Sequence, residues 1–360
     1  MAGTILVIAR LAVQSEQLAY VRDLIRERGH DVIMIEAEQH ARAAALYREQ
    51  RIHGVLGIGD AGTALLATRG MRQLPIGVPK LMVSIAAAGD TRPYVDVSDV
   101  AMLNPVIDVP GLNAVSRRVL ANAVGAICGM VEQEPPVTED RPLLAATMFG
   151  VTTPCVTAVR ELLERAGYEV LVFHATGSGG RAMEGLIDAG WFAGVVDVTT
   201  TEWADEVVGG LRSAGPDRLG AAGRQGIPQV VSVGALDMVN FGRLDTVPAA
   251  LRGRTLHRHT PHVTLLRTTP AECSEIGRRI AARLNRARGP TVLVLPLKGV
   301  SQIDAEGQPF HDPEADRALF DSLREHVAAP VTIVEVDAHI NDPAFADAVV
   351  ATFLAITNER

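Results

Sequence analysis

Histidines, carboxylates and a lysine follow several apolar runs in the C-terminal half of the chain. The runs VLVF, GVVDV, VVSVGA and VLVLPL each predict a buried strand, and polar residues come soon after each of them. Because ligands gather at the carboxyl ends of strands in an open parallel sheet, these side chains are expected to share one crevice. Imidazoles, carboxylates and a lysine together suit proton transfer. The residues expected to carry this chemistry are His174, Glu202, Asp237, His257 and Lys298.

A second group of residues near the same strand ends could hold an anionic substrate. The stretch HATGSGG, residues 174–180, places glycines between a strand and a helix, where backbone N–H groups can approach an anion. Arg181 follows in the first helical turn, where the helix dipole disfavours a cation unless it faces an anion or a carboxylate of the protein itself. The expected substrate-binding residues are Gly177, Gly179, Gly180, Arg181, Thr200, Thr201, Arg267, Thr268, Ser301 and His339.

A divalent metal is one alternative for this region. His257 and His259 would project from the same face of an extended segment, and Glu202 or Asp237 could add a carboxylate ligand. Histidines acting as acids, bases or hydrogen-bond partners are the other alternative. The Asp-Pro pairs that begin at Asp312 and Asp342 predict helix starts rather than metal sites.

A glycine-rich loop in the N-terminal half forms a separate candidate. The stretch GIGDAGT, residues 57–63, follows a predicted strand and precedes a helical pattern. A dinucleotide fingerprint would open the first strand–helix unit and have an acid at the end of the next strand, whereas here the next strand ends near Ser84. Two alternatives therefore remain for this loop: it binds a phosphate or sugar-phosphate, or it is a tight turn that binds no ligand. The residues concerned are Gly57, Gly59, Asp60, Gly62 and Thr63.

Alternating apolar and helical segments must position both groups of residues. The pattern predicts an α/β protein with two Rossmann-like parallel-sheet domains facing an interdomain cleft. The segment QEPPVTEDRP, residues 133–142, is rich in proline and acids, so the domains are expected at 1–138 and 139–360. At 360 residues and 48% apolar composition, the chain can fill two cores.

Composition narrows the expected partners and compartment. The 34 basic residues are outnumbered by 42 acidic ones, and the net charge of −8 argues against nucleic acid as a partner. The three cysteines are widely spaced, which favours free thiols in a cytoplasmic protein. The N-terminus does not resemble a signal peptide, and no uninterrupted apolar run predicts a membrane span.

Long runs distributed over nearly the whole chain resemble the Tm-one-like ATP-binding family, whose members are similar to the N-terminal domain of the tomato mosaic virus resistance protein of plants. The resemblance rests on KLMVSIAAAGDTRPYVDVSD, VLVFHATGSGGRAMEGLI, VSVGALDMVNFG and HINDPAFADAVV, among others. It implies a two-domain α/β protein that self-associates, binds ATP and has a TIM-barrel protein as a partner. It also adds the loop residues Gly89, Asp90 and Thr91 to the candidates for cofactor binding.

The chain departs from this family in the loop after its first predicted strand. Where relatives carry Asp-Thr-Lys, this sequence has Ala12, Val13 and Gln14. The change removes an acid able to hold Mg²⁺ and a lysine able to neutralise phosphate, which argues against intact ATP binding.

Three functions follow as expectations. The first is a hydrolase or carbon–carbon lyase that acts on an oxygenated anionic small molecule in the C-terminal domain. The second is an ATP-binding regulatory or inhibitory module without chemistry, and the third is a scaffold that pairs with a homologue or a TIM-barrel protein. The Ala- and Gly-rich helix predicted over 113–130 favours a dimer through close helix packing.

Overall fold

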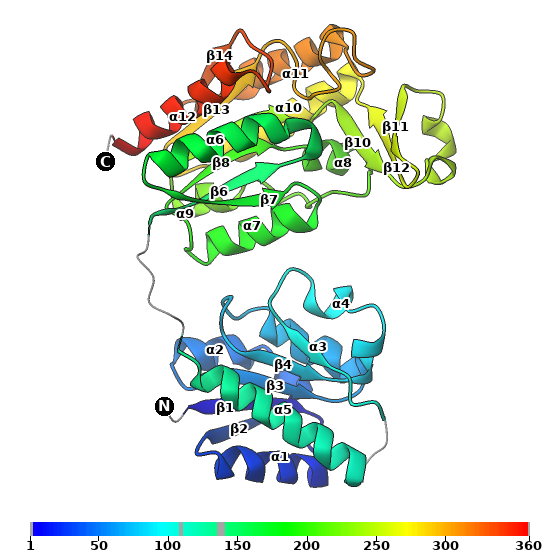
Figure 1. The fold of residues 1–360 in the computed structure, drawn as a ribbon, viewed down its shortest axis with the longest axis vertical. Helices are drawn as coiled ribbons and strands as arrows, with labels where there is room; N and C mark the ends of the chain where they lie inside the picture. The colour runs from blue at the N-terminus through cyan, green and yellow to red at the C-terminus, as the bar shows by residue number, and fades with distance from the viewer. Residues whose placement is uncertain (1–2, 108–110, 135–140, 359–360) are drawn as a thin grey trace. The chain divides into compact units, whose positions relative to one another are not determined.

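The computed structural model describes residues 3–107, 111–134 and 141–358. The chain divides into two compact units, Met1–Thr138 and Glu139–Arg360 (Figure 1). The predicted linker, residues 133–142, lies largely outside the described residues.

The N-terminal unit is built on a five-stranded parallel sheet with the order β2-β1-β3-β4-β5. Its three inner strands, β1, β3 and β4, are short apolar runs that are buried on both faces, as expected for a parallel sheet covered by helices, whereas the edge strands β2 and β5 are partly exposed. They are β1 (Thr4–Ala9), β2 (Asp31–Glu36), β3 (Gly54–Ile58), β4 (Lys80–Val83) and β5 (Ala101–Leu103).

Helices cover both faces of this sheet because successive side chains of a strand point to opposite sides. Ile5 and Val7 of β1 pack with α1 (Ser15–Glu27) and α5 (Ala114–Glu132). Leu6 and Ile8 pack with α2 (Arg42–Arg48) and α3 (Ala61–Met71), and the short helix α4 (Arg92–Val95) lies near α3 (Figure 1).

The α5 helix is the one described helix that is long and apolar enough to cross a membrane by length and composition. Core helices of water-soluble folds pass the same test, so this is weak evidence for a membrane span. Leu120, Val124 and Ile127 of α5 are buried against the sheet, which accounts for much of its apolar character. The expected dimer through this helix stays a prediction.

The C-terminal unit contains a six-stranded parallel sheet with the order β14-β13-β9-β8-β6-β7 and a three-stranded antiparallel sheet with the order β10-β12-β11. The parallel strands are β6 (Leu143–Met148), β7 (Glu169–His174), β8 (Gly194–Thr199), β9 (Gln229–Gly234), β13 (Thr291–Pro296) and β14 (Thr332–Val336). The antiparallel strands are β10 (Met238–Phe241), β11 (Leu256–Thr260) and β12 (Val263–Arg267).

Helices again form a layer on each face of the large sheet (Figure 1). One layer consists of α6 (Thr153–Arg165) and α12 (Pro343–Asn358), which share a core. The other layer consists of α7 (Ser178–Asp188), α8 (Glu202–Val208), α9 (Ala221–Gln225), α10 (Pro270–Leu284) and α11 (Pro313–His326). Asp312 caps α11 by accepting hydrogen bonds from the N–H groups of Glu314 and Ala315, which confirms the helix start predicted there.

The predicted α/β class with two parallel sheets is confirmed. Continuous apolar strands and helices with one apolar face left few other ways to bury the chain.

Candidate functional site

The strand order separates residues that were expected to share one crevice. His174 ends β7 at one edge of the large sheet, whereas Lys298 follows β13, with β9, β8 and β6 in between. Four strand spacings amount to roughly 19 Å, so the expectation of one shared crevice is wrong for this pair. His257 belongs to β11 of the separate antiparallel sheet.

Glu202 is a buried structural carboxylate rather than a group that lines an open crevice. It is 1% exposed at the start of α8. Its Oε1 accepts hydrogen bonds from the N–H groups of Gly177 (2.7 Å) and Gly180 (3.1 Å), and its Oε2 accepts one from Arg218 Nε (2.6 Å). The glycine loop therefore holds an anion as expected, but the anion is the side chain of Glu202 and not a substrate. A side chain on Gly179 would collide with the backbone oxygen of His174, so Gly179 serves close packing.

Arg218 is the residue at the centre of this cluster, and sequence analysis missed it. Its guanidinium is 1% exposed and binds both carboxylate oxygens of Asp197 in addition to Glu202 and Glu184. Burial acts to lower the pKa of Arg218, but Asp197 and Glu202 outweigh it and raise the pKa, so the side chain stays charged. Arg218 lies in a Gly- and Pro-containing loop without periodicity, so no local pattern marks it as buried.

Arg267 was expected to clamp a substrate, and instead it joins elements within the C-terminal unit. It is 5% exposed, and its Nη2 lies 2.7 Å from Asp316 Oδ1 and 3.2 Å from Asp304 Oδ1. Its Nε donates to the backbone oxygen of Phe310. Thr268 is turned inward as well, since its hydroxyl donates to the backbone oxygen of Leu236.

Three carboxyl groups surround the single guanidinium of Arg267. Burial raises the pKa of Asp237 to about 6, that of Asp304 to about 9, and also that of Asp316. Asp237 is 1% exposed and accepts a hydrogen bond from the Ser301 hydroxyl at 2.8 Å. At neutral pH this cluster therefore retains a proton, as closely spaced buried carboxyls do.

Most of the other expected residues of the C-terminal unit have partners of their own within the chain. Thr200 is buried and donates to the backbone oxygen of Ser232, and Thr201 is buried close to Met238. Lys298 is exposed and pairs with Asp337 at 2.9 Å. Three further residues are placed as follows: Arg181 lies in the first turn of α7, exposed His174 lies at the end of β7, and His339 Nε2 lies 2.8 Å from the backbone oxygen of Ser301.

A metal has no evident ligand set within the described ranges. The rings of His257 and His259 are 6.5 Å apart between centroids. No group of three or more histidine, cysteine, aspartate or glutamate side chains that could hold a metal ion occurs among residues 3–107, 111–134 and 141–358.

The N-terminal unit has a cavity of about 300 Å³ at the carboxyl ends of β1, β3 and β4. The chain passes from β1 to β2 on one side and then crosses to β3 on the other, so the strand order reverses between β1 and β3. This reversal is where parallel α/β sheets bind ligands. The polar lining residues are Arg10, Gln14, Gln17, Asp60, Thr63 and Ser116, and the apolar ones are Val13, Ile58, Val83, Ile85, Pro105, Ile107, Val119 and Leu120.

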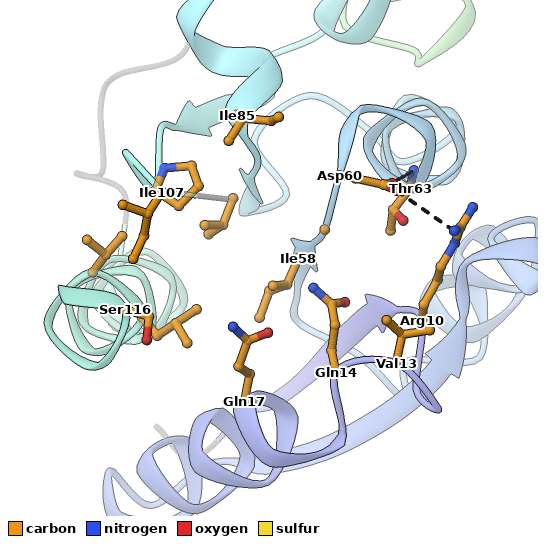
Figure 2. A pocket seen from close by; sticks show the side chains of 15 residues that line it. Arg10, Val13, Gln14, Gln17, Ile58, Asp60, Thr63, Ile85, Ile107 and Ser116 are labelled. Carbon is orange, nitrogen blue, oxygen red and sulfur yellow. Dashed lines mark hydrogen bonds and ion pairs between the residues drawn. The ribbon is translucent and has the colours of Figure 1, made fainter. Parts of the chain in front are cut away.

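Asp60 already occupies the anion position at the start of α3. Its Oδ1 accepts a hydrogen bond from the N–H of Thr63 at 2.7 Å, and Arg10 lies 3.8 Å from its Oδ2 (Figure 2). The bonds from Thr63 lower the pKa of Asp60, which keeps it ionised. A phosphate at this helix end would meet that negative charge, so the loop is poorly suited to the phosphate expected there.

Two glycines of this loop, Gly57 and Gly59, serve packing, whereas Gly62 has room for a side chain. A side chain on Gly57 would meet Met82, Met71 and Ala67, so its absence lets α3 lie close to β3. Gly59 is equally close to the side chain of Thr63. Gly89, Asp90 and Thr91 are not among the residues that line the cavity, and Asp90 pairs with Arg92, which lowers the pKa of Asp90 to about 2.

Gln14 is the polar residue of the cavity whose hydrogen-bonding capacity is unused. Its Oε1 is shielded from solvent and has no hydrogen-bond partner within the described part of the chain. The neighbouring Gln17 donates to the backbone oxygen of Gly111 at 3.0 Å. Both amides point toward the same space as Ile58 (Figure 2). Gln14 was noted in the sequence only because it replaces a lysine of the related family.

Comparison with family models matches both units of the chain. Residues 36–136 match the N-terminal domain, and residues 141–357 the C-terminal domain, of the uncharacterised protein family UPF0261.

Individual relatives agree with this assignment. The chain is 51% identical to a UPF0261 protein of Clostridium tetani over 91% of this chain and 82% of that protein. It is 51% identical to one of Rhizobium meliloti over 90% and 82%, respectively. It is also 45% identical to the tomato ToMV resistance protein Tm-1(GCR237), over 86% of this chain and 42% of that protein.

Solved structures add nothing to these matches. A substrate-binding protein of Clostridium difficile aligns with 12% identity and a TM-score of 0.22, over 63% of this chain and 73% of that one. This similarity is too low to support an argument. From the family models and the relatives, the chain belongs to the UPF0261 protein family.

Proposed function

We propose that this protein binds a small uncharged molecule in the cavity of its N-terminal unit. The observation that carries the proposal is the amide of Gln14, whose shielded Oε1 lacks a partner in the described chain and lines a cavity at the switch point of the sheet. A buried acceptor without a hydrogen bond is costly, and a ligand that donates to it removes the cost.

The charge of the cavity lining favours an uncharged ligand. Among the described residues, Arg10 and Asp60 are the charged ones that line it, and they pair with each other, so the formal charge of this described lining is zero. A nucleoside triphosphate would need several positive charges or a metal held by acids. Ala12, Val13 and Gln14 supply neither.

The shape of the hydrogen-bonding groups indicates the class of ligand. A side-chain amide offers an acceptor next to a donor, and it pairs best with a molecule that has the same two groups side by side. Heteroaromatic bases and carboxamides carry a donor and an acceptor side by side in this way. Their flat apolar faces suit contact with Ile58, Val83 and Leu120. Nucleosides without phosphate combine both properties.

The enzyme expected from the sequence has less support. It required His174, Glu202 and Lys298 in one pocket, and Glu202 is buried against Arg218 while β7 and β13 are separated by three strands. A role without chemistry, as a ligand-dependent regulatory module, agrees better with the cavity. ATP fits the lining of this cavity less well than a nucleoside does.

Calorimetric titration with adenosine, inosine and ATP plus Mg²⁺ tests the proposal. The wild-type protein is expected to bind a nucleoside more tightly than ATP, and Gln14→Leu is expected to weaken nucleoside binding about tenfold, the effect of one lost hydrogen bond to a buried amide. The double variant Ala12→Asp with Gln14→Lys should shift the preference toward ATP. Arg26→Leu, an exposed change on α1 away from the cavity, is the matched control.

Tighter binding of ATP than of any nucleoside by the wild-type protein would contradict this proposal. So would nucleoside binding that Gln14→Leu leaves unchanged, because the amide would then have no part in it.

A further inference from the structure

A second hollow, of about 540 Å³, lies on the antiparallel sheet of the C-terminal unit. It forms between the segment that joins β10 to β11 and the turn that joins β11 to β12. We name it the arginine groove, defined by Arg243, Leu244, Asp245, Arg252, Arg258, Pro261 and His262.

The arginine groove has a positive formal charge, opposite in sign to the net charge of the whole chain. Three guanidinium groups and one carboxylate line it, so its formal charge is +2 with His262 neutral, whereas the chain carries −8. Like charges brought together at a surface repel one another, and a bound anion relieves that repulsion.

Two of the three arginines have partners within the groove, and the backbone holds Arg252 in place. Arg252 Nε donates to the backbone oxygen of Val247 at 2.8 Å, and its Nη2 donates to that of Asp245 at 2.7 Å. Arg243 pairs with the Asp245 carboxylate, its Nε lying 3.1 Å from Oδ1. Because its two backbone contacts order Arg252 in advance, a ligand would lose little free energy in ordering that side chain. The Arg243–Asp245 pair is more than 60% exposed on both sides and orders Arg243 less.

Arg258 is the arginine of the groove whose N–H donors are available to a ligand. It lies on β11, next to the irregular pairing between β11 and β12, and no ion pair or side-chain hydrogen bond involves it within the described ranges. The backbone contacts of Arg252 are made by two of its nitrogens, which leaves Nη1 of Arg252 as a further donor.

We propose that the arginine groove binds a dianionic oxyanion, specifically the phosphate group of a small phosphate ester. A phosphate monoester has two negative charges at neutral pH, which match the charge of +2, and its oxygens accept the paired N–H groups of arginine. This site lies in the C-terminal unit and does not depend on the cavity at Gln14.

The proposal can be tested by titrating the full chain with inorganic phosphate and with glycerol 3-phosphate. Binding is monitored by NMR of the arginine side chains. Both compounds are expected to bind at one site with shifts in the Arg258 and Arg252 signals, and glycerol alone is expected not to bind. Arg258→Ala should weaken binding about tenfold, as loss of a hydrogen bond to a charged group does. Arg258→Lys, which keeps the charge, should weaken it less, and Arg286→Ala, an exposed arginine outside the groove, should leave it unchanged.

Added salt should weaken the binding because these charges are exposed to solvent. Equal binding by the wild type and Arg258→Ala would overturn the proposal, provided that circular dichroism shows both folded. Binding of inorganic phosphate without glycerol 3-phosphate would overturn the ester as the ligand. Shifts that rise linearly without saturation, or preference for an acidic peptide over both phosphates, would overturn the site itself.

Discussion

Replacing Arg218 with methionine is expected to lower the free energy of unfolding of the C-terminal unit by about 3–5 kcal/mol. The change keeps the volume of the side chain roughly constant but leaves Asp197, Glu202 and Glu184 buried without their shared cation. The N–H groups of Gly177 and Gly180 would still face Glu202, so the loss measures the missing charge rather than the loop.

Urea unfolding followed by tryptophan fluorescence measures this loss in the correct unit. Both tryptophans, Trp191 and Trp203, lie in the C-terminal unit, so their signal reports its unfolding alone. Arg224→Met is the matched control, because Arg224 pairs with Asp188 at 2.6 Å with both side chains more than 40% exposed. An exposed pair contributes less than about 1 kcal/mol. Similar losses in the two variants would show that the Arg218 cluster has no special structural role.

Replacing Asp304 with asparagine is expected to change how stability depends on pH. Burial raises the pKa of Asp304 to about 9 in the folded chain, whereas an unfolded aspartate ionises near 4. Between these values the folded state holds a proton that the unfolded state has released, so raising the pH stabilises the unfolded state. The expected fall in the free energy of unfolding is about 1.4 kcal/mol per pH unit for each such proton.

Asparagine resembles the protonated carboxyl and has no proton to lose, so Asp304→Asn should gain stability relative to the wild type as the pH rises from 5 to 9. Urea unfolding at several pH values measures the difference. Asp188→Asn, which changes an exposed carboxyl of the same unit, should follow the wild type. A constant difference between Asp304→Asn and the wild type across this range would mean that Asp304 is ionised in the folded state throughout.

Together these clusters explain why Glu202 and Asp237, two of the five expected catalytic residues, are buried, whereas His174 and Lys298 are exposed at separate strand ends. Glu202 and Arg267 are each satisfied by groups of the same unit, and the threonines after β8 are buried. In the N-terminal unit, the corresponding edge keeps a cavity with an unsatisfied amide.

The sequence alone was sufficient for the parallel α/β fold and for local features such as the Asp312 cap. These depend on periodicity and on residues close together in the chain, which local patterns record. It also located the glycine loop at 174–180 and its ability to hold an anion.

Only the tertiary structure decided which anion that loop holds and which charges are paired. Glu202 meets Gly177 and Arg218, and Arg267 meets Asp304 and Asp316, across separations of 16 to 49 residues. An ionisable residue next to a strand end has the same sequence pattern whether it faces a substrate or a carboxylate of its own chain. The order of strands in the sheet and the packing of distant loops determine which of these it meets, because they set both its burial and its partners.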